Sequence, residues 1–356
     1  MPSSRICSGR CVACCCLALA IAEFAGSIDL RAEEVMPKHI TPATLKAVRA
    51  GLDYLAKSQG QDGSWTNDEG GRSYPVAVTG LAGTALLANG NSPTRGRYAP
   101  HVERATQYLL ACSTPTGLIT GPGQDNGQPM HGHGFALMYL ACVYGTETKP
   151  AIRDKTKLVV DKAVKLTAEG QSGDGGWTYI PGAGDEGSVT VTQVQALRAA
   201  HNAGLAVPRG TIAQAVQYIE RCSTPEGGIC YSLRNQGGAR LAISAAAVAT
   251  LYNAGQYDAP VANRCLEYVW HHFEDTKNWR HGGHDFYCQL YASQAFYLAG
   301  DKYWDVYFPA VREQLISMQD KSDGSWNGDG IGKAYGTAIA LIILQLPYKY
   351  LPVYQR

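Results

Sequence analysis

Residues 49–65, RAGLDYLAKSQGQDGSW, constrain the fold of this chain most strongly, because they hold a unit that recurs further along. The apolar residues around this stretch follow helical spacing: Leu45, Val48, Leu52 and Leu55. The segment up to Gln59 is therefore predicted to be an amphipathic helix with one apolar stripe. Asp62 and Gly63 favour a turn after it. Trp65 then offers a large ring to cover the helix end, and its indole N–H will need a partner once buried.

Six strongly apolar segments alternate with more polar ones along the chain. They are predicted to be helices at residues 80–89, 134–144, 189–203, 241–254, 286–299 and 336–346. Five of them end at a glycine, a common helix terminator: Gly90, Gly145, Gly204, Gly255 and Gly300. These glycines recur about every 50 residues. The spacing indicates one array of helix pairs and not several unrelated domains.

An array of six helix pairs, none of which can bury its apolar faces alone, is predicted to close into a ring. Two of the turns keep visible identity, YLLACSTPTGLI from Tyr108 and YIERCSTPEGGI from Tyr218, which indicates duplication. The apolar helices carry almost no charge, so they should be buried on most sides and form an inner ring. The predicted fold class is all-α, an (α/α)6 toroid. It should occupy residues 45–356 as a single domain, after a short linker at 33–44.

The first copy of the unit resembles the QW repeat of squalene-hopene cyclases and protein prenyltransferase β subunits. The matching residues are Arg49, Ala50, Tyr54, Leu55, Gln59, Gly63 and Trp65. Weaker copies follow at residues 171–177 (QSGDGGW) and 315–326 (LISMQDKSDGSW). The chain looks most like exported bacterial proteins that carry prenyltransferase and squalene-oxidase repeats. This resemblance covers nearly everything from Leu45 onward and implies the toroid of the terpenoid cyclase and prenyltransferase superfamily.

The reaction motifs of those enzymes are incomplete here. The Asp-x-Asp-Asp run that protonates an alkene in squalene-hopene cyclases is missing, and so is the Cys-Gly-Glu-Gln thioester motif of complement-like toroid domains. Prenyltransferases hold zinc through Asp, Cys and a His in a Tyr-His-Thr context, but Gly336 stands where that His would be. Asp285 and Cys288 have the wrong separation for the other two ligands. We therefore predict no metal site and no cofactor.

Polar residues gather where loops meet the starts of the apolar helices, which would share one end of a closed toroid. The candidate catalytic residues there are Asp185, Glu186, His284 and Asp285. The candidate substrate-binding residues are His131, His133, Phe135, Tyr139, Tyr287, Tyr291 and Tyr335. His281 would join the same rim. Helix capping and ordinary core packing account for the same residue types, so both alternatives stay open.

Residues 1–32 are predicted to be an export signal, with Arg5 and Arg10 ahead of a 12-residue small and apolar run. That run is too short to span a bilayer, so the mature chain should not be an integral membrane protein. Periplasmic or extracellular localisation follows. Six cysteines remain after cleavage: Cys112, Cys142, Cys222, Cys230, Cys265 and Cys288. Export permits disulfides among them, while buried thiols are the alternative.

The leading functional hypothesis is a toroid whose apolar cavity binds or transforms an isoprenoid or another lipid, so the expected partner is a hydrophobic small molecule. A net charge of +1 argues against a nucleic-acid partner. The first alternative is an exported binding protein without catalysis. The second is a polysaccharide-active (α/α)6 enzyme, which would need two facing carboxylates from among Asp125, Asp185, Glu186 and Asp285.

Overall fold

A computed structural model describes residues 36–66, 74–121, 127–276 and 284–355. Residues Pro37–Arg356 form one compact unit. Its described residues hold twelve α-helices and no β-strand, which confirms the predicted all-α class. The expected export signal at 1–32, and with it the proposed cleavage, lies outside the described residues, as do Asp125 and His281.

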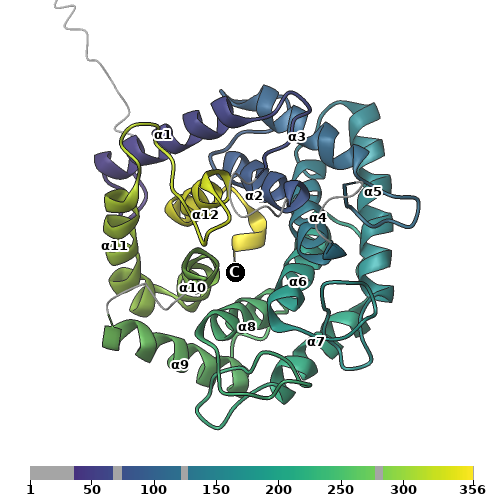
Figure 1. The fold of residues 1–356 in the computed structure, drawn as a ribbon, viewed down its shortest axis with the longest axis vertical. Coiled ribbons are helices and arrows are strands. Elements are labelled where there is room, and N and C mark those ends of the chain that lie inside the picture. The colour runs from purple at the N-terminus through teal and green to yellow at the C-terminus, as the bar shows by residue number, and fades with distance from the viewer. Residues whose placement is uncertain (1–35, 67–73, 122–126, 277–283, 356) are drawn as a thin grey trace, which may run out of the picture. The chain divides into compact units, whose positions relative to one another are not determined.

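The helices of this unit alternate between an outer and an inner position (Figure 1). The outer helices are α1 (Pro42–Ser58), α3 (Ala99–Ala111), α5 (Pro150–Glu169), α7 (Arg209–Arg221), α9 (Pro260–Thr276) and α11 (Asp301–Met318). The inner helices are α2 (Pro75–Leu87), α4 (Met130–Tyr144), α6 (Gly187–Asn202), α8 (Leu241–Asn253), α10 (Asp285–Ala299) and α12 (Lys333–Gln345). Each inner helix packs against the next, and α12 packs against α2. The ring is therefore closed, and the predicted (α/α)6 toroid is confirmed.

Burial explains why the two sets of helices have different sequences. The outer helix α1 buries one stripe, including Val48, Leu52 and Leu55, and leaves its other side in water. The inner helix α4 buries nearly every residue from Met130 to Val143, because it has neighbours on all sides. An amphipathic helix suits the first environment, and a helix without charges suits the second.

A three-residue clasp repeats in the turns that follow α1, α5 and α11. The glutamine Nε2 donates to the glycine carbonyl of its own turn and to a backbone carbonyl of the next outer helix. The tryptophan Nε1 donates to a backbone carbonyl of the outer helix that precedes the turn. The clasps are Gln59, Gly63 and Trp65; Gln171, Gly175 and Trp177; and Gln319, Gly324 and Trp326. In the last clasp Gln319 reaches the Ala47 carbonyl of α1 at 2.9 Å, so the final repeat holds the first.

Each clasp is also tied to the following inner helix. The backbone N–H of Trp65, Trp177 and Trp326 donates to the hydroxyl of Thr79, Thr190 and Thr337, at 2.9 to 3.0 Å. In the two turns that lack tryptophan, Ile119 and Ile229 take its place and donate to His133 Nδ1 and Ser244 Oγ. His133 therefore occupies a structural position of the repeat, equivalent to the three threonines.

One predicted detail of the helix boundaries is wrong. The inner helices α2, α4 and α12 begin several residues before Gly80, Gly134 and Gly336. These glycines lie inside helices because another element comes too close for a side chain: a Cβ on Gly80 would lie 2.8 Å from the Phe135 carbonyl carbon of α4. Gly145 ends α4 as predicted, with a φ of −68°, whereas the other four predicted terminating glycines have a positive φ.

The chain end covers the ring at the C-terminal ends of the inner helices. After α12, two short 3-10 helices, η2 (Leu346–Tyr348) and η3 (Pro352–Tyr354), turn back toward the ring centre (Figure 1). Val353 and Tyr354 are buried, and η3 packs against α6. In the described part of the chain, no helix combines the length and the apolar character needed to cross a membrane.

Candidate functional site

A cavity of about 940 Å³ opens among the starts of all six inner helices. Aliphatic and aromatic side chains make up most of its lining: Tyr74, Ala77, Val78, Leu81, Phe135, Tyr179, Tyr231, Leu241, Ala242, Ile243, Tyr287, Ile331 and Tyr335. The charged and titratable lining residues apart from tyrosine are His131, Glu186, Arg240, His284, Asp285 and Cys288. The cavity lies at the end of the toroid where the sequence placed the candidate residues.

Glu186 is both a helix cap and part of the cavity wall. It is the N-cap of α6, and its carboxylate accepts from the backbone N–H of Ser188 and of Val189, each at 2.9 Å. The Ser188 hydroxyl donates to the same carboxylate at 2.5 Å. Burial raises the pKa of Glu186, and these three donors oppose that rise because they favour the ionised form. Glu186 thus places a carboxyl group in the wall of a largely apolar cavity.

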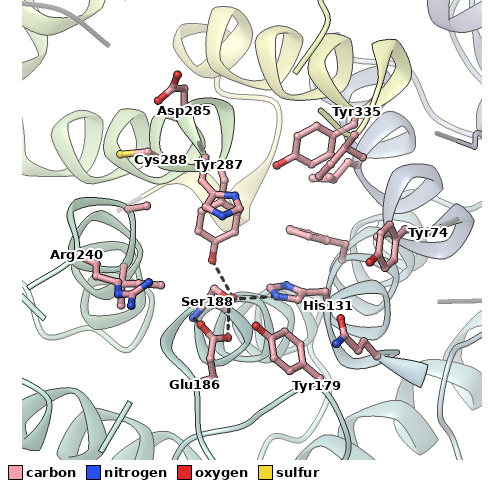
Figure 2. A pocket seen from close by; sticks show the side chains of 18 of the residues that line it. Tyr74, His131, Tyr179, Glu186, Ser188, Arg240, Asp285, Tyr287, Cys288 and Tyr335 are labelled. Atoms are coloured by element: carbon pink, nitrogen blue, oxygen red, sulfur yellow. Dashed lines mark hydrogen bonds between the residues drawn. The ribbon is translucent and has the colours of Figure 1, made fainter. Parts of the chain in front are cut away.

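Ser188 links Glu186 to an imidazole and a phenol (Figure 2). His131 Nε2 lies 3.2 Å from Ser188 Oγ, and the Tyr287 hydroxyl donates to the Ser188 carbonyl at 2.9 Å. Burial, together with the nearby His284, lowers the pKa of His131 to about 4, so the ring is neutral near neutral pH. While Glu186 is ionised it takes the only hydroxyl proton of Ser188, and His131 can then only donate to Ser188. Ser188 is therefore not arranged as a histidine-activated nucleophile.

A second polar group lies on the loop that precedes α8, residues 231–240, which we call the rim segment. Its Tyr231 hydroxyl lies 2.7 Å from the Tyr179 hydroxyl, and the Arg240 guanidinium stands 5.0 Å above the Tyr231 ring. Burial, with the nearby Glu186 as a smaller contribution, raises the pKa of Tyr179, so both hydroxyls stay protonated. Among the described residues, Arg240 is the arginine or lysine that lines the cavity, and it is exposed at the mouth.

The adjacent acids Asp185 and Glu186 have different positions in the structure. The side chain of Asp185 is buried away from the cavity lining, and its Oδ2 accepts from the Leu233 N–H at 2.8 Å. Arg234 Nε lies 4.0 Å from Oδ1. Asp185 thus anchors the rim segment, while Glu186 reaches the cavity.

The start of α10 brings three predicted residues to the cavity: His284, Asp285 and Tyr287. In Figure 2 the carboxylate of Asp285 points away from the His131 and Ser188 side chains. The backbone N–H groups of Phe286 and Tyr287 are held by Asp329, whose carboxylate also accepts from the Tyr335 hydroxyl at 3.2 Å. Asp329 was not predicted from the sequence.

Three predicted binding residues do not line the cavity: His133, Tyr139 and Tyr291. Tyr139 donates to the Val102 carbonyl of α3 at 2.8 Å, so it joins α4 to the outer ring. Tyr291 is fully buried behind Tyr287, with ring centroids 4.8 Å apart. These two rings pack between layers, which was the alternative left open for them.

His133 is fully buried between α5 and the turn that follows α3. The Ile119 N–H donates to Nδ1 at 3.1 Å, so the neutral ring carries its proton on Nε2, which lies 3.0 Å from Thr167 Oγ1. Burial lowers the pKa of His133 to about 4, although the backbone carbonyl of Ala163 acts in the opposite direction. The ring is a structural connection that works only in its neutral form.

We expect the stability of the protein to fall as the pH is lowered from about 6.5 to about 4, since the unfolded chain binds a proton on His133 that the folded ring excludes. The unfolded state binds more protons in this window, so the free energy of unfolding rises with pH by up to about 1.4 kcal/mol per pH unit for each such histidine. His131 contributes to the slope of unfolding free energy against pH for the same reason. His133→Gln should therefore remove about half of the slope that the two histidines produce together. Urea unfolding at a series of pH values measures it, and an unchanged slope would contradict a neutral buried His133.

Five of the residues that sequence reasoning missed lie outside the helices: Tyr74, Tyr179, Tyr231, Arg240 and Asp329. A sixth, Ser188, lies in the first turn of α6. One signal could have found two of them, because Tyr179 and Tyr231 both stand two positions after the buried Trp177 or Ile229 of their turns. Among the described residues, no group of three or more His, Cys, Asp or Glu side chains is arranged to hold a metal ion.

No protein-family model matches the chain. No curated protein matches it either. Solved structures, by contrast, match the chain. An Asp-to-Asn variant of the type II terpene cyclase MstE from Scytonema, in complex with geranylgeranyl dihydroxybenzoate, is 13% identical with a TM-score of 0.57, over 87% of this chain and 98% of that one.

Two other similar structures are carbohydrate enzymes. The α-1,6-mannanase from Salegentibacter sp. is 9% identical with a TM-score of 0.61, over 86% of this chain and 99% of that one. A D-mannose isomerase is 12% identical with a TM-score of 0.60, over 88% of this chain and 98% of that one. At such identities the likeness concerns the fold, so the terpenoid cyclases are not singled out. The chain has the (α/α)6 toroid fold that terpene cyclases share with glycoside hydrolases.

Proposed function

We propose that the protein binds an isoprenoid or another largely apolar lipid in the central cavity. The lining carries this proposal: Ala77, Val78 and Leu81 of α2 form an aliphatic wall, and five tyrosines and Phe135 contribute aromatic surface. A volume of about 940 Å³ is large enough for a long hydrocarbon, since ligand pockets usually span about 300–1,000 Å³. Burial of such a chain stabilises the complex by about 25 cal/mol per Å² of apolar surface.

Glu186 is the residue that we propose as the acid if the bound lipid is transformed. It reaches the cavity, and burial raises its pKa, which favours a protonated carboxyl group at higher pH than for an exposed glutamate. Ring faces such as those of Phe135 and Tyr287 lie on the same cavity and would stabilise positive charge on a ligand. His284 and Asp285 stay in the proposal because they line the cavity. Asp185 does not line it and has a positioning role, because it anchors the rim segment.

A polysaccharide-active enzyme is the alternative, and the similar structures support it equally. An inactive variant of the mannanase was solved with α-1,6-mannotetrose. Tyrosine ring faces also suit sugar rings, and Glu186 and Asp285 are the two lining carboxylates among the described residues. The usual mechanism needs two carboxyl groups that flank one bond. Glu186 is engaged by three donors and Asp285 points away from Ser188, so the lining favours a lipid.

Titration calorimetry with geranylgeraniol and with α-1,6-mannotetrose tests the proposal. We expect the isoprenoid alcohol to bind and the tetrasaccharide not to bind. Ala77→Trp places an indole in the cavity, so the affinity for geranylgeraniol should fall at least about tenfold, equivalent to about 1.4 kcal/mol. Ala213→Trp makes the same exchange on the exposed side of α7 and should leave binding unchanged.

Glu186→Gln separates binding from catalysis. If Glu186 is an acid, the variant should bind geranylgeraniol with nearly the same affinity and lose any turnover of a bound isoprenoid. Equal turnover in both proteins would remove the catalytic role and favour the binding protein without chemistry. Binding of mannotetrose without geranylgeraniol would contradict the lipid proposal and favour the polysaccharide alternative.

A further inference from the structure

Two cysteines face each other across the turn that follows α7. The Cys230 N–H donates to the Cys222 carbonyl at 3.0 Å, next to an antiparallel bridge between Ser223 and Ile229. Directly opposite residues of this kind have Cα atoms about 5.5 Å apart. A disulfide needs roughly 4.4–6.8 Å. Here one of the two bonds of such a pair is made, since the Cys222 N–H donates to the Tyr218 carbonyl of α7. The pairing therefore points to a backbone separation within the range of a disulfide.

The two thiols are also close to each other and shielded from water. Cys222 is 1% exposed and Cys230 is 3% exposed. Burial raises the pKa of Cys222 to about 12; the Tyr218 hydroxyl acts in the opposite direction, and the Cys230 thiol beside it adds to the rise. The thiolate is the reactive form, so a bond between these residues would have to form before the turn is fully buried.

The duplicated turn after α3 provides an internal comparison. There the Thr120 N–H donates to the Cys112 carbonyl at 3.0 Å, next to a bridge between Ser113 and Ile119. The two turns thus share one backbone arrangement, and threonine stands in one where Cys230 stands in the other. The turn itself does not require a cysteine at this position.

We propose that Cys222 and Cys230 form a disulfide when the chain folds in an oxidising environment. Each thiol loses one hydrogen, a sulfur–sulfur bond forms, and an external disulfide such as oxidised glutathione is reduced to two thiols. The other described cysteines belong to different elements: Cys112 follows α3, Cys142 lies in α4, Cys265 in α9 and Cys288 in α10. The bond would fix the start of the rim segment, since Tyr231 of the cavity lining comes directly after Cys230.

Peptide mapping of the full chain tests this inference. The protein is refolded with oxidised and reduced glutathione, unfolded, alkylated and digested with trypsin. Cleavage after Arg221 and Arg234 places both cysteines in one peptide, residues 222–234. We expect this peptide to carry no alkyl group and to be lighter by two hydrogens than its reduced form. The peptide of residues 105–153, with Cys112 and Cys142, should carry two alkyl groups. Two alkyl groups on the 222–234 peptide of the folded protein would overturn the proposal, as would its linkage to another peptide.

Cys230→Thr copies the duplicated turn and serves as the matched variant. In the wild type, reduction should lower the melting temperature by roughly 5 °C, because closing a short loop restricts the unfolded chain. The variant should melt near the reduced wild type and show no response to reductant. Cys142→Ser should keep the wild-type response. An equal response to reductant in Cys230→Thr would also overturn the proposal. None of these readouts depends on a ligand of the cavity.

Discussion

Replacing Trp177 by alanine is expected to lower the free energy of unfolding by about 3–5 kcal/mol, and the same range applies to Trp65 and Trp326. The Trp177 side chain has no exposed surface, and its Nε1 donates to the Thr167 carbonyl at 2.8 Å. Alanine leaves a cavity where the ring was and removes the donor of a buried carbonyl. Trp177 also packs in one buried cluster with Ala215 of α7, so both α5 and α7 lose a contact. Urea unfolding followed by circular dichroism measures the change.

Trp177→Phe is the control for this prediction. Phenylalanine keeps much of the buried ring but cannot donate to Thr167, so a smaller loss of about 1–3 kcal/mol is expected. Ligand binding should decline only as far as the folded fraction declines, because no clasp tryptophan lines the cavity. An alanine variant with unchanged unfolding and lost binding would show that the ring belongs to the binding site.

The fold could be predicted because the residues that make the contacts of each repeat lie close together in the sequence. Gln59, Gly63 and Trp65 make three bonds to backbone groups, and those bonds depend on the turn more than on the identity of distant side chains. The helix starts could not be predicted as well. The sequence predicts Gly80 as a helix boundary, but it marks a close approach of α2 to α4, which only the assembled ring reveals.

The position of the site was predictable, while the role of each residue was not. All inner helices start at one end of a closed toroid, so their first residues must meet there. Asp185 and Glu186 are equivalent by charge, yet the strand-like path before α6 turns one toward the rim segment and the other toward the cavity. His133 is two residues from His131 and lies on the opposite side of α4 from the cavity, toward α5.

Gly175→Ala is the second prediction with a large effect. Gly175 has a φ of +91°, and a Cβ there would fall well inside contact distance of the Gln214 carbonyl of α7. A left-handed alanine costs about 1–2 kcal/mol by itself. Because the obstacle is helix backbone and not a flexible side chain, α7 must move and the Gln171 bonds to the turn and to Thr211 must lengthen. The total loss should reach about 3 kcal/mol or more.

Gly204→Ala isolates the contact from the backbone strain. Gly204 has a φ of +82°, and no atom lies within 4 Å of its Cβ position. The substitution there should cost only the left-handed conformation, about 1–2 kcal/mol. The excess loss in Gly175→Ala then measures how closely the turn docks on the next outer helix. Equal losses of stability at Gly175 and Gly204 would mean that the turn and α7 lie farther apart than the hydrogen bonds of the clasp require. The glycine of the repeat would then be needed for its conformation alone.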